Sequence, residues 1–116
     1  MKYLHLAETL ATASGEAEQR SAISRAYYAA YHRALEQAAY LGLNTAPDEC
    51  ESHHQACWRA YLRERNRARR KVGESGSRLR GLRNDADYEP AFRVDAAKAA
   101  QAVDDARSLI NKIALT

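Results

Sequence analysis

The chain has 116 residues, 46% hydrophobic and 28% charged, which is the size of one domain with one apolar core. A mean hydropathy of −0.64 and the lack of any apolar run of about 18 residues exclude a membrane-spanning segment. The formal net charge of +3 conceals a basic segment, residues 59–83, in which ten Lys and Arg stand against two Glu. This segment is expected to attract phosphate groups.

The N-terminal half predicts two helices. Twenty-four alanines against five glycines and two prolines favour an all-α fold. Apolar residues recur at helical spacing over residues 2–13, and Ser14-Gly15 interrupts the pattern. Residues 16–41 carry the longest helical pattern, which Gly42 is expected to end. Its expected buried stripe is Ile23, Ala26, Tyr27, Ala30, Ala34 and Ala38, with Tyr28, Tyr31 and Leu35 beside it.

The C-terminal half predicts three further helices. Asp48-x-x-Glu51 or Ser52-x-x-Gln55 could cap the third, and Ser52 is preferred. This helix is expected to reach about Val72, with residues 73–77 as a flexible connection to a short fourth helix. Asp95 is expected to cap the last helix. The residues expected to be buried are Trp58, Tyr61, Leu62, Ala68, Val72, Leu79, Leu82, Ala86, Ala96, Ala99, Ala100, Val103, Ala106, Ile110 and Ile113. The predicted architecture is an up-and-down bundle of four to five helices in one domain, residues 1–116.

Four arginines share one face of the predicted third helix. Arg59, Arg63, Arg67 and Arg70 are spaced by four, four and three residues, and we call them the arginine ridge. Such a ridge is expected to bind RNA or another phosphate ligand. The alternative is that these arginines only keep an exposed helix face solvated.

The segment from Cys50 to Cys57 contains four residues of the types that bind zinc, with His53 and His54 between the cysteines. On one straight helix the two cysteines would lie about 10 Å apart, too far for one tetrahedral site. We expect no metal and no other cofactor; the alternative is a distorted metal site, since Cys50 lies outside the helix if Ser52 caps it. Two cysteines are also too few for a disulfide framework, and both are expected to be free thiols.

Two segments together resemble a known family. Residues 21–32 read Ser-Ala-Ile-Ser-Arg-Ala-Tyr-Tyr-Ala-Ala-Tyr-His, and residues 79–88 read Leu-Arg-Gly-Leu-Arg-Asn-Asp-Ala-Asp-Tyr. Their order and separation are similar to those of the HEPN domain (higher eukaryotes and prokaryotes nucleotide-binding), where the first string lies on the long second helix. Ser52-His53 also resembles the start of that family's third helix. The resemblance extends over about residues 16–113.

The resemblance implies a helical bundle that commonly dimerises and places polar motifs of both protomers along a shared cleft. Many members are metal-independent ribonucleases of toxin–antitoxin, phage-defence and RNA-processing systems, and others bind nucleotides or pair with small nucleotidyltransferases. The ribonuclease motif is Arg, then four to six residues, then His. Matched at Arg83, it requires a histidine where this chain has Tyr88, Glu89 and Pro90. The chain therefore departs from the catalytic pattern.

The expected site centres on Arg83, whose planar fork can still bind a phosphate oxygen. Asp87 and Tyr88 complete the expected catalytic set, although a phenol is protonated at neutral pH and is a poor base. The expected ligand-binding residues are Arg25, Tyr28, His32, Asn84 and Asp85, of which the first three share a helix face. A purely structural alternative has Arg83 paired with Asp87 at i, i+4 while Tyr88 closes the core.

Three classes of function remain open. The first is a HEPN-type RNA- or nucleotide-binding module, accessory or regulatory in a prokaryotic toxin–antitoxin or defence system. It would form a homodimer, with a separately encoded nucleotidyltransferase or antitoxin as a candidate partner. The second is a metal-independent endoribonuclease in which Asp87, Tyr88 or His32 moves protons beside Arg83. The third is a structural dimer that binds a protein. The polar N-terminus lacks the apolar block of a secretory signal, so a cytoplasmic protein without a membrane partner is expected.

Overall fold

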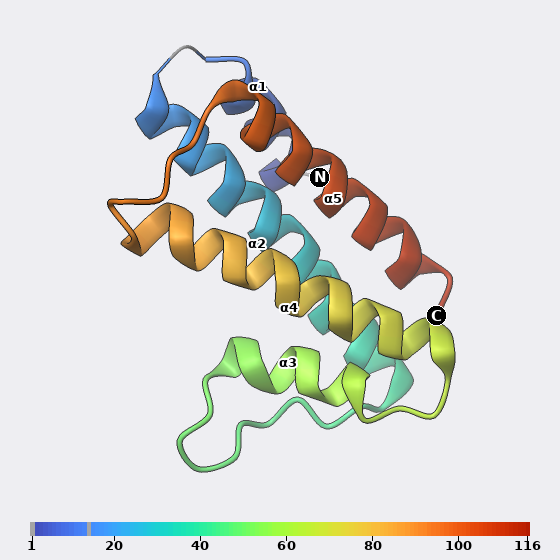
Figure 1. Ribbon diagram of the computed structural model, residues 1–116. Coiled ribbons are helices and arrows are strands. Elements are labelled where there is room, and N and C mark those ends of the chain that lie inside the picture. Colours follow the sequence, from blue (N-terminus) through green and yellow to red (C-terminus); the bar gives the residue numbers. More distant parts are fainter. Residues whose placement is uncertain (1, 14) are drawn as a thin grey trace.

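Five helices follow one another along the chain in the computed structural model, which describes residues 2–13 and 15–116. They are α1 (Lys2–Ala11), α2 (Glu16–Leu41), α3 (His53–Leu62), α4 (Arg67–Tyr88) and α5 (Ala96–Ala114). The described part contains no strand, so the predicted all-α bundle is confirmed, but it is not strictly up-and-down, because α2 and α3 run in the same direction (Figure 1). Ser14 of the predicted interruption lies outside the described residues. None of the helices within these ranges is long and apolar enough to cross a membrane.

The long helix α2 is the centre of the bundle, because it contacts every other helix. α4 runs antiparallel to both α2 and α5, and α3 packs on α4 at the side away from α5 (Figure 1). All six residues of the stripe predicted for α2 are buried. Four of them are alanines, and such small side chains let neighbouring helices approach closely.

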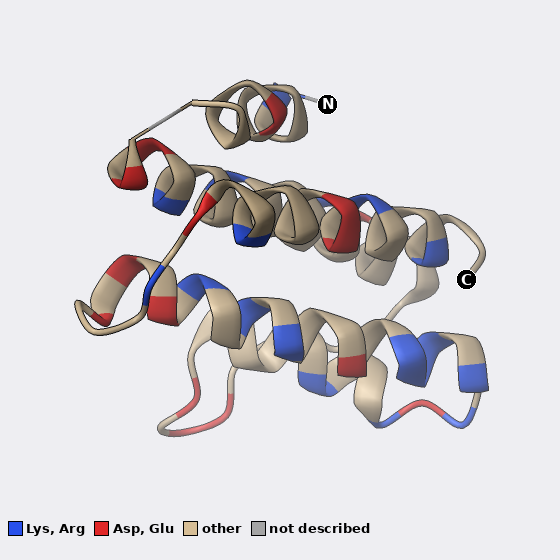
Figure 2. Cartoon of the chain, turned by 45° about the horizontal axis from the view of Figure 1, so that its top comes forward, with Lys and Arg blue, Asp and Glu red and all other residues tan. Residues whose placement is uncertain are grey.

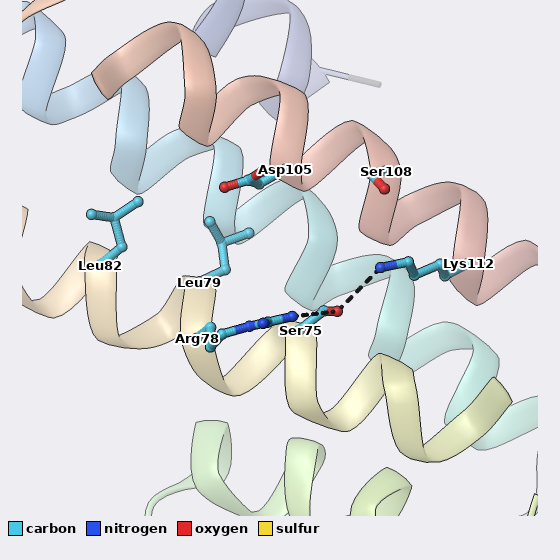
Figure 3. Close-up of a pocket in the computed structure, with 7 residues that line it drawn as sticks. All are labelled: Ser75, Arg78, Leu79, Leu82, Asp105, Ser108 and Lys112. Carbon is cyan, nitrogen blue, oxygen red and sulfur yellow. Dashed lines mark hydrogen bonds between the residues drawn. The ribbon is translucent and has the colours of Figure 1, made fainter. Parts of the chain in front are cut away.

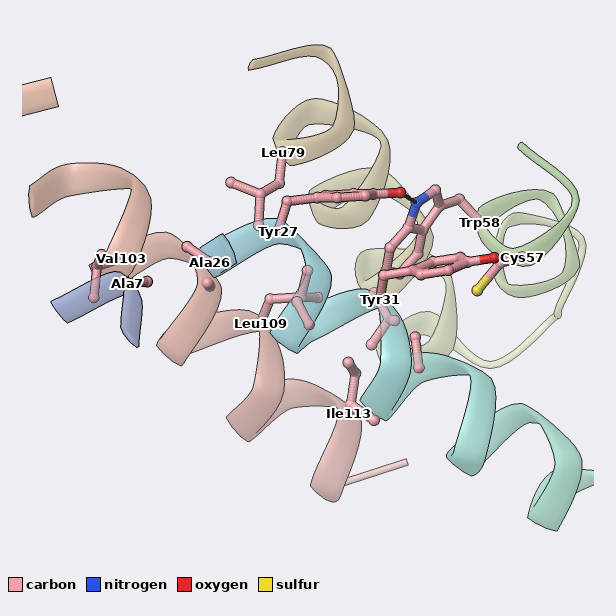
Figure 4. Packing of buried hydrophobic residues seen from close by; sticks show 14 of the residues in the cluster. Ala7, Ala26, Tyr27, Tyr31, Cys57, Trp58, Leu79, Val103, Leu109 and Ile113 are labelled. Carbon is pink, nitrogen blue, oxygen red and sulfur yellow. Dashed lines mark hydrogen bonds between the residues drawn. The ribbon is translucent and has the colours of Figure 1, made fainter. Parts of the chain in front are cut away.

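Large aromatic side chains fill the space between α2, α3 and α4. Trp58, Tyr27 and Tyr61 are the largest fully buried side chains. The Tyr61 hydroxyl donates a hydrogen bond to the Ala34 carbonyl oxygen at 2.7 Å, which satisfies its polar end inside the core. Figure 4 shows Trp58 between α3 and the tyrosines of α2, with Leu109 and Ile113 extending from α5 into the same cluster and Val103 and Ala7 at its far end.

The predicted helix ends depend on local signals, and three of them are confirmed. Gly42 ends α2 in the left-handed region with φ of 72°, which glycine adopts without steric cost. The Ser52 hydroxyl accepts from the Gln55 backbone N–H while the Gln55 side chain accepts from Ser52, a complete capping box. The Asp95 carboxylate accepts from the Lys98 backbone N–H at 2.8 Å and starts α5.

The predicted break between the third and fourth helices is wrong in position. α3 ends at Leu62, and Asn66 starts α4 by accepting from the Arg69 backbone N–H. Residues 73–77 lie inside α4 and are helical. The two glycines there serve close packing: a Cβ on Gly73 would lie 2.8 Å from the Leu62 backbone nitrogen, and one on Gly76 would lie 2.1 Å from the Trp58 ring.

The earlier helix break also changes which residues are buried. Leu62 and Ala68, expected in the core, are exposed because the chain turns between them. In α5, Ala96 and Ala100 are exposed, while Ala102 and Leu109 take core positions. Leu82 and Ile110 are half-buried, and the remaining residues of the predicted set are buried.

Candidate functional site

The buried guanidinium of Arg83 lies at the centre of a group of aromatic rings. Arg83 extends from α4 and is only 6% exposed. Its central carbon lies 5.2 Å from the centre of the Tyr27 ring and 5.5 Å from that of Tyr28, both on α2. The Tyr88 ring lies 6.0 Å away. These distances are those of cation–π contacts, which stabilise a positive charge in a place with little water.

The polar partners of Arg83 are few for so buried a charge. Its Nη1 atom lies 3.6 Å from Asp87 Oδ2, a long ion pair at i, i+4. The same carboxylate oxygen accepts from the Ser24 hydroxyl at 3.2 Å. The Arg83 Nε atom is buried and has no hydrogen-bond partner within the described residues, as is also true of Nε in Arg69 and Arg80; only Arg83 combines this with contacts to three tyrosine rings. A buried donor without an acceptor costs about 1–3 kcal/mol, so Arg83 is in a position that an incoming acceptor would stabilise.

A second chain of contacts brings His54 of α3 to the same tyrosine. The Trp58 indole N–H donates to the Tyr27 hydroxyl oxygen at 3.0 Å, and this oxygen lies 2.8 Å from His54 Nδ1. Among the described residues the hydrogen of this hydroxyl has no acceptor other than Nδ1, so it is assigned as the donor to Nδ1, which leaves the ring proton of His54 on Nε2. The His54 ring also stacks on Tyr31, with 4.1 Å between ring centres.

Burial, together with the charges of the site, keeps His54 neutral at physiological pH. Burial, and after it the positive charges of Arg83 and Arg80, lower the pKa of His54 to about 4. Burial also raises the pKa of the Tyr27 hydroxyl well above its ordinary value. At neutral pH the histidine and the tyrosine are therefore both uncharged, and Arg83 holds the positive charge of the site.

This pKa shift predicts a pH dependence of stability. The folded state binds fewer protons than the unfolded state between the ordinary histidine pKa of 6.5 and about 4, so stability falls as the pH falls through this window. Since the ring is partly exposed, we expect wild type to lose of the order of 1–2 kcal/mol more than His54→Gln between pH 7 and pH 4. Urea unfolding of both proteins at several pH values measures this difference. If the unfolding free energies of wild type and His54→Gln fell equally with pH, the lowered pKa of His54 would be wrong.

In the sequence, His54 was predicted only as a candidate zinc ligand, and its contact with Tyr27 was missed. The structure brings no group of three or more His, Cys, Asp or Glu together at one point among the residues it describes. Cys50 is exposed while Cys57 is buried, and burial raises the Cys57 thiol pKa to about 12. The histidine was detectable, because His54 and Trp58 are four residues apart, as are Tyr27 and Tyr31. This spacing gives two facing helices one aromatic stripe each.

The residues predicted to bind ligand are only partly brought together. Tyr28 is half-buried and contacts Arg83, and exposed His32 stacks on Tyr28 with 6.0 Å between ring centres. Arg25 is exposed, and its side chain makes none of the hydrogen bonds or ion pairs found in the described residues. Asn84 is half-buried and Asp85 is exposed, and neither side chain contacts Arg83 through a hydrogen bond or ion pair there.

The predicted catalytic residues have different environments. Asp87 is paired with Arg83, as the structural alternative requires, and its side chain is 26% exposed. Tyr88 is 72% exposed, so the expectation that it closes the core is wrong. Its ring is instead an accessible edge of the site, adjacent to the buried guanidinium.

The end of α4 that carries this edge is anchored to α2 by Arg20. The Arg20 guanidinium donates to the carbonyl oxygens of Ala86 at 2.8 Å and Glu89 at 3.3 Å, and also to that of Phe92. It also pairs with Glu16 at 3.1 Å on its own helix. A cation at the carboxyl end of a helix satisfies free carbonyls and complements the helix dipole. Arg20 therefore positions the last turn of α4.

The arginine ridge is not one helix face, because the chain breaks between α3 and α4. Arg59 lies in α3, pairs with Glu51 at 3.1 Å and donates to the Ala46 carbonyl oxygen at 2.8 Å. Arg63 follows α3, and Arg67 and Arg70 begin α4; all three are exposed. Figure 2 shows Lys and Arg distributed along α4. The basic segment is thus a surface spread over α4 and the preceding turn.

No family model, curated protein or solved structure matches the chain. The chemistry of the site therefore has to be inferred from its own residues. The site combines a buried guanidinium with a free donor, a partly exposed tyrosine edge, a neutral histidine and a nearby basic surface.

Proposed function

We propose that this chain is a HEPN-type helical module that binds single-stranded RNA through Arg83 and the tyrosines around it. The observation that carries the proposal is the Arg83 guanidinium, which contacts three tyrosine rings and leaves its buried Nε–H without an acceptor. A phosphate oxygen or a base edge would supply that acceptor once a local movement at the exposed Tyr88 edge opens the buried guanidinium. Arginine planes and aromatic rings are the groups on which unstacked RNA bases stack.

The surroundings of Arg83 support a strand that enters from the exposed edge. Tyr88 offers an open ring face, and His32 extends the aromatic surface beyond Tyr28. The exposed Arg67 and Arg70 at the other end of α4 add positive charge along the same helix. Phosphate contacts of this kind position the strand and make affinity depend on salt.

The HEPN assignment is supported by how the two resembling segments meet. Residues 21–32 lie on α2 and residues 79–88 on α4, and the contacts of Arg83 join them. As part of this proposal the module is a homodimer with an accessory or regulatory role in a prokaryotic toxin–antitoxin or defence system. Its partner would then be a separately encoded nucleotidyltransferase or antitoxin.

Fluorescence anisotropy with a labelled single-stranded oligoribonucleotide tests the proposal. Tyr88→Ala is expected to weaken binding about tenfold, because one stacked base contributes about 1–3 kcal/mol. The matched control is Tyr40→Ala, since Tyr40 is 84% exposed on α2 and lies outside the site. The RNA affinity of wild type and of both variants should fall steeply as the salt concentration rises.

Three outcomes would count against RNA binding. Equal losses of RNA affinity in Tyr88→Ala and Tyr40→Ala would show that RNA does not bind at the proposed site. Equal competition by a mononucleotide would indicate a nucleotide-binding module instead. No retention of RNA at low salt would favour a protein partner.

A second candidate function, metal-independent RNA cleavage, is favoured by one observation: α3 brings His54 to the tyrosine that contacts Arg83. Transesterification by a 2′-hydroxyl needs a base of nearly neutral pKa, and His54, with its pKa near 4 and its Nδ1 occupied by Tyr27, is a weak one. Binding is therefore the better supported function. Cleavage in EDTA that disappears in His54→Asn would reverse this order.

A further inference from the structure

A separate pocket lies between α4 and α5, away from the arginine–tyrosine contacts. Its volume is about 330 Å³, within the range of small-molecule sites. Ser75 and Arg78 of α4 and Ser108 and Lys112 of α5 surround one end, as Figure 3 shows. Arg83 points from another side of α4 towards the tyrosines of α2, so the two sites are distinct.

Two cations converge on one hydroxyl group in this pocket. Arg78 Nη2 and Lys112 Nζ each lie 3.4 Å from the Ser75 hydroxyl oxygen. The two charges are therefore within about 7 Å of each other and repel. Neither side chain takes part in an ion pair among the described residues. An anion between them would relieve the repulsion and accept charge-assisted hydrogen bonds.

The other end of the pocket has different chemistry. Asp105 lies two turns before Lys112 on α5, about 10 Å along the helix. Its carboxylate accepts one hydrogen bond, from Gln101 Nε2 at 2.9 Å, and retains capacity for further donors. Leu79 and Leu82 line the pocket from α4 and provide an apolar floor.

We propose that this pocket binds a small phosphate monoester that also carries hydroxyl or amino donors. The phosphate lies between Arg78 and Lys112 and accepts from the hydroxyl groups of Ser75 and Ser108. The donors of the ligand meet Asp105, and its carbon skeleton rests on Leu79 and Leu82. A sugar phosphate and a mononucleotide both have this chemistry and fit the volume of the pocket.

Isothermal titration calorimetry of the full chain tests the site with ribose 5-phosphate, AMP, inorganic phosphate and adenosine. The phosphate esters are expected to bind and adenosine is not. Lys112→Gln should weaken the esters about tenfold. Lys71→Gln, an exposed lysine of α4 outside the pocket, makes the same charge change and should leave binding unchanged. Asp105→Ala should weaken the esters but not inorganic phosphate.

Several results would overturn the site. One is that neither ester binds at millimolar concentration, and another is that adenosine and AMP bind equally well. A third is that Lys112→Gln and Lys71→Gln lose affinity for the esters equally. Stronger binding of AMP than of ribose 5-phosphate would assign the pocket to nucleotides, and the reverse would assign it to sugar phosphates. Arg83→Met should retain ester binding, so the result does not depend on whether the chain binds RNA.

Discussion

Substitution of Arg83 by Met is expected to weaken RNA binding by tenfold or more while leaving the fold as stable as wild type or more stable. Methionine has a similar length and is apolar, so it fills the space between the tyrosines. It removes the buried Nε–H that lacks an acceptor. Replacement of both partners of a buried ion pair by apolar side chains is often neutral or stabilising by about 1–4 kcal/mol, whereas loss of one partner destabilises when the other charge stays buried. Asp87 keeps its bond from Ser24 and is partly solvated, so it tolerates the loss.

RNA affinity is expected to fall by tenfold or more, because the buried positive charge at the centre of the site is gone. Anisotropy and urea unfolding on the same preparation measure the two effects. Arg83→Lys is the matched variant, since it keeps the charge but loses the planar fork, and it should also bind RNA weakly. A large loss of stability with unchanged RNA affinity would show that Arg83 is only structural.

Gly76→Ala is expected to be the most destabilising single-methyl change in α4. The added Cβ would lie 2.1 Å from Trp58 Cε3 and 2.4 Å from two further ring atoms. Trp58 is fully buried and its N–H is bonded to Tyr27, so it has no free space to move into. Overpacking of this kind costs about 1–3 kcal/mol, occasionally more, and corresponds to a fall in Tm of roughly 5–10 °C.

Gly81→Ala is the control for this change, because a Cβ there meets nothing within 4 Å. Alanine is a better helix former than glycine, so this variant should gain about 0.5–1 kcal/mol. Trp58 is the only tryptophan of the chain, so its fluorescence reports directly on the packing between α3 and α4. Equal stability of the two variants would contradict the close approach of the helices.

The parts of the fold that the sequence predicts well depend on short-range signals. Gly42 ends α2 through its own backbone conformation, and Ser52 and Asp95 start helices through bonds to residues three positions away. The small-residue stripe of α2 similarly follows from its helical spacing. Such features require no knowledge of the neighbouring helices.

The errors occur where a residue acts through a partner far along the chain. Gly73 and Gly76 indicate a flexible connection when they are read locally, but they are the contact surface for α3. The spacing of His54 and Trp58 is visible in the sequence, but the role of His54 depends on how α3 packs against Tyr27 and Tyr31. Arg83 itself was found from a motif, whereas its burial and its unpartnered Nε–H follow only from the packing of α2 against α4.

The buried Nε–H of Arg83 gives the most direct test of the central claim. We would follow the arginine Nε–H resonances of ¹⁵N-labelled protein by NMR during titration with a single-stranded oligoribonucleotide, using Arg83→Lys to assign the Arg83 signal. This signal is expected to move markedly as RNA supplies the missing acceptor. Binding of RNA with the Arg83 signal unchanged would show that RNA does not bind at Arg83.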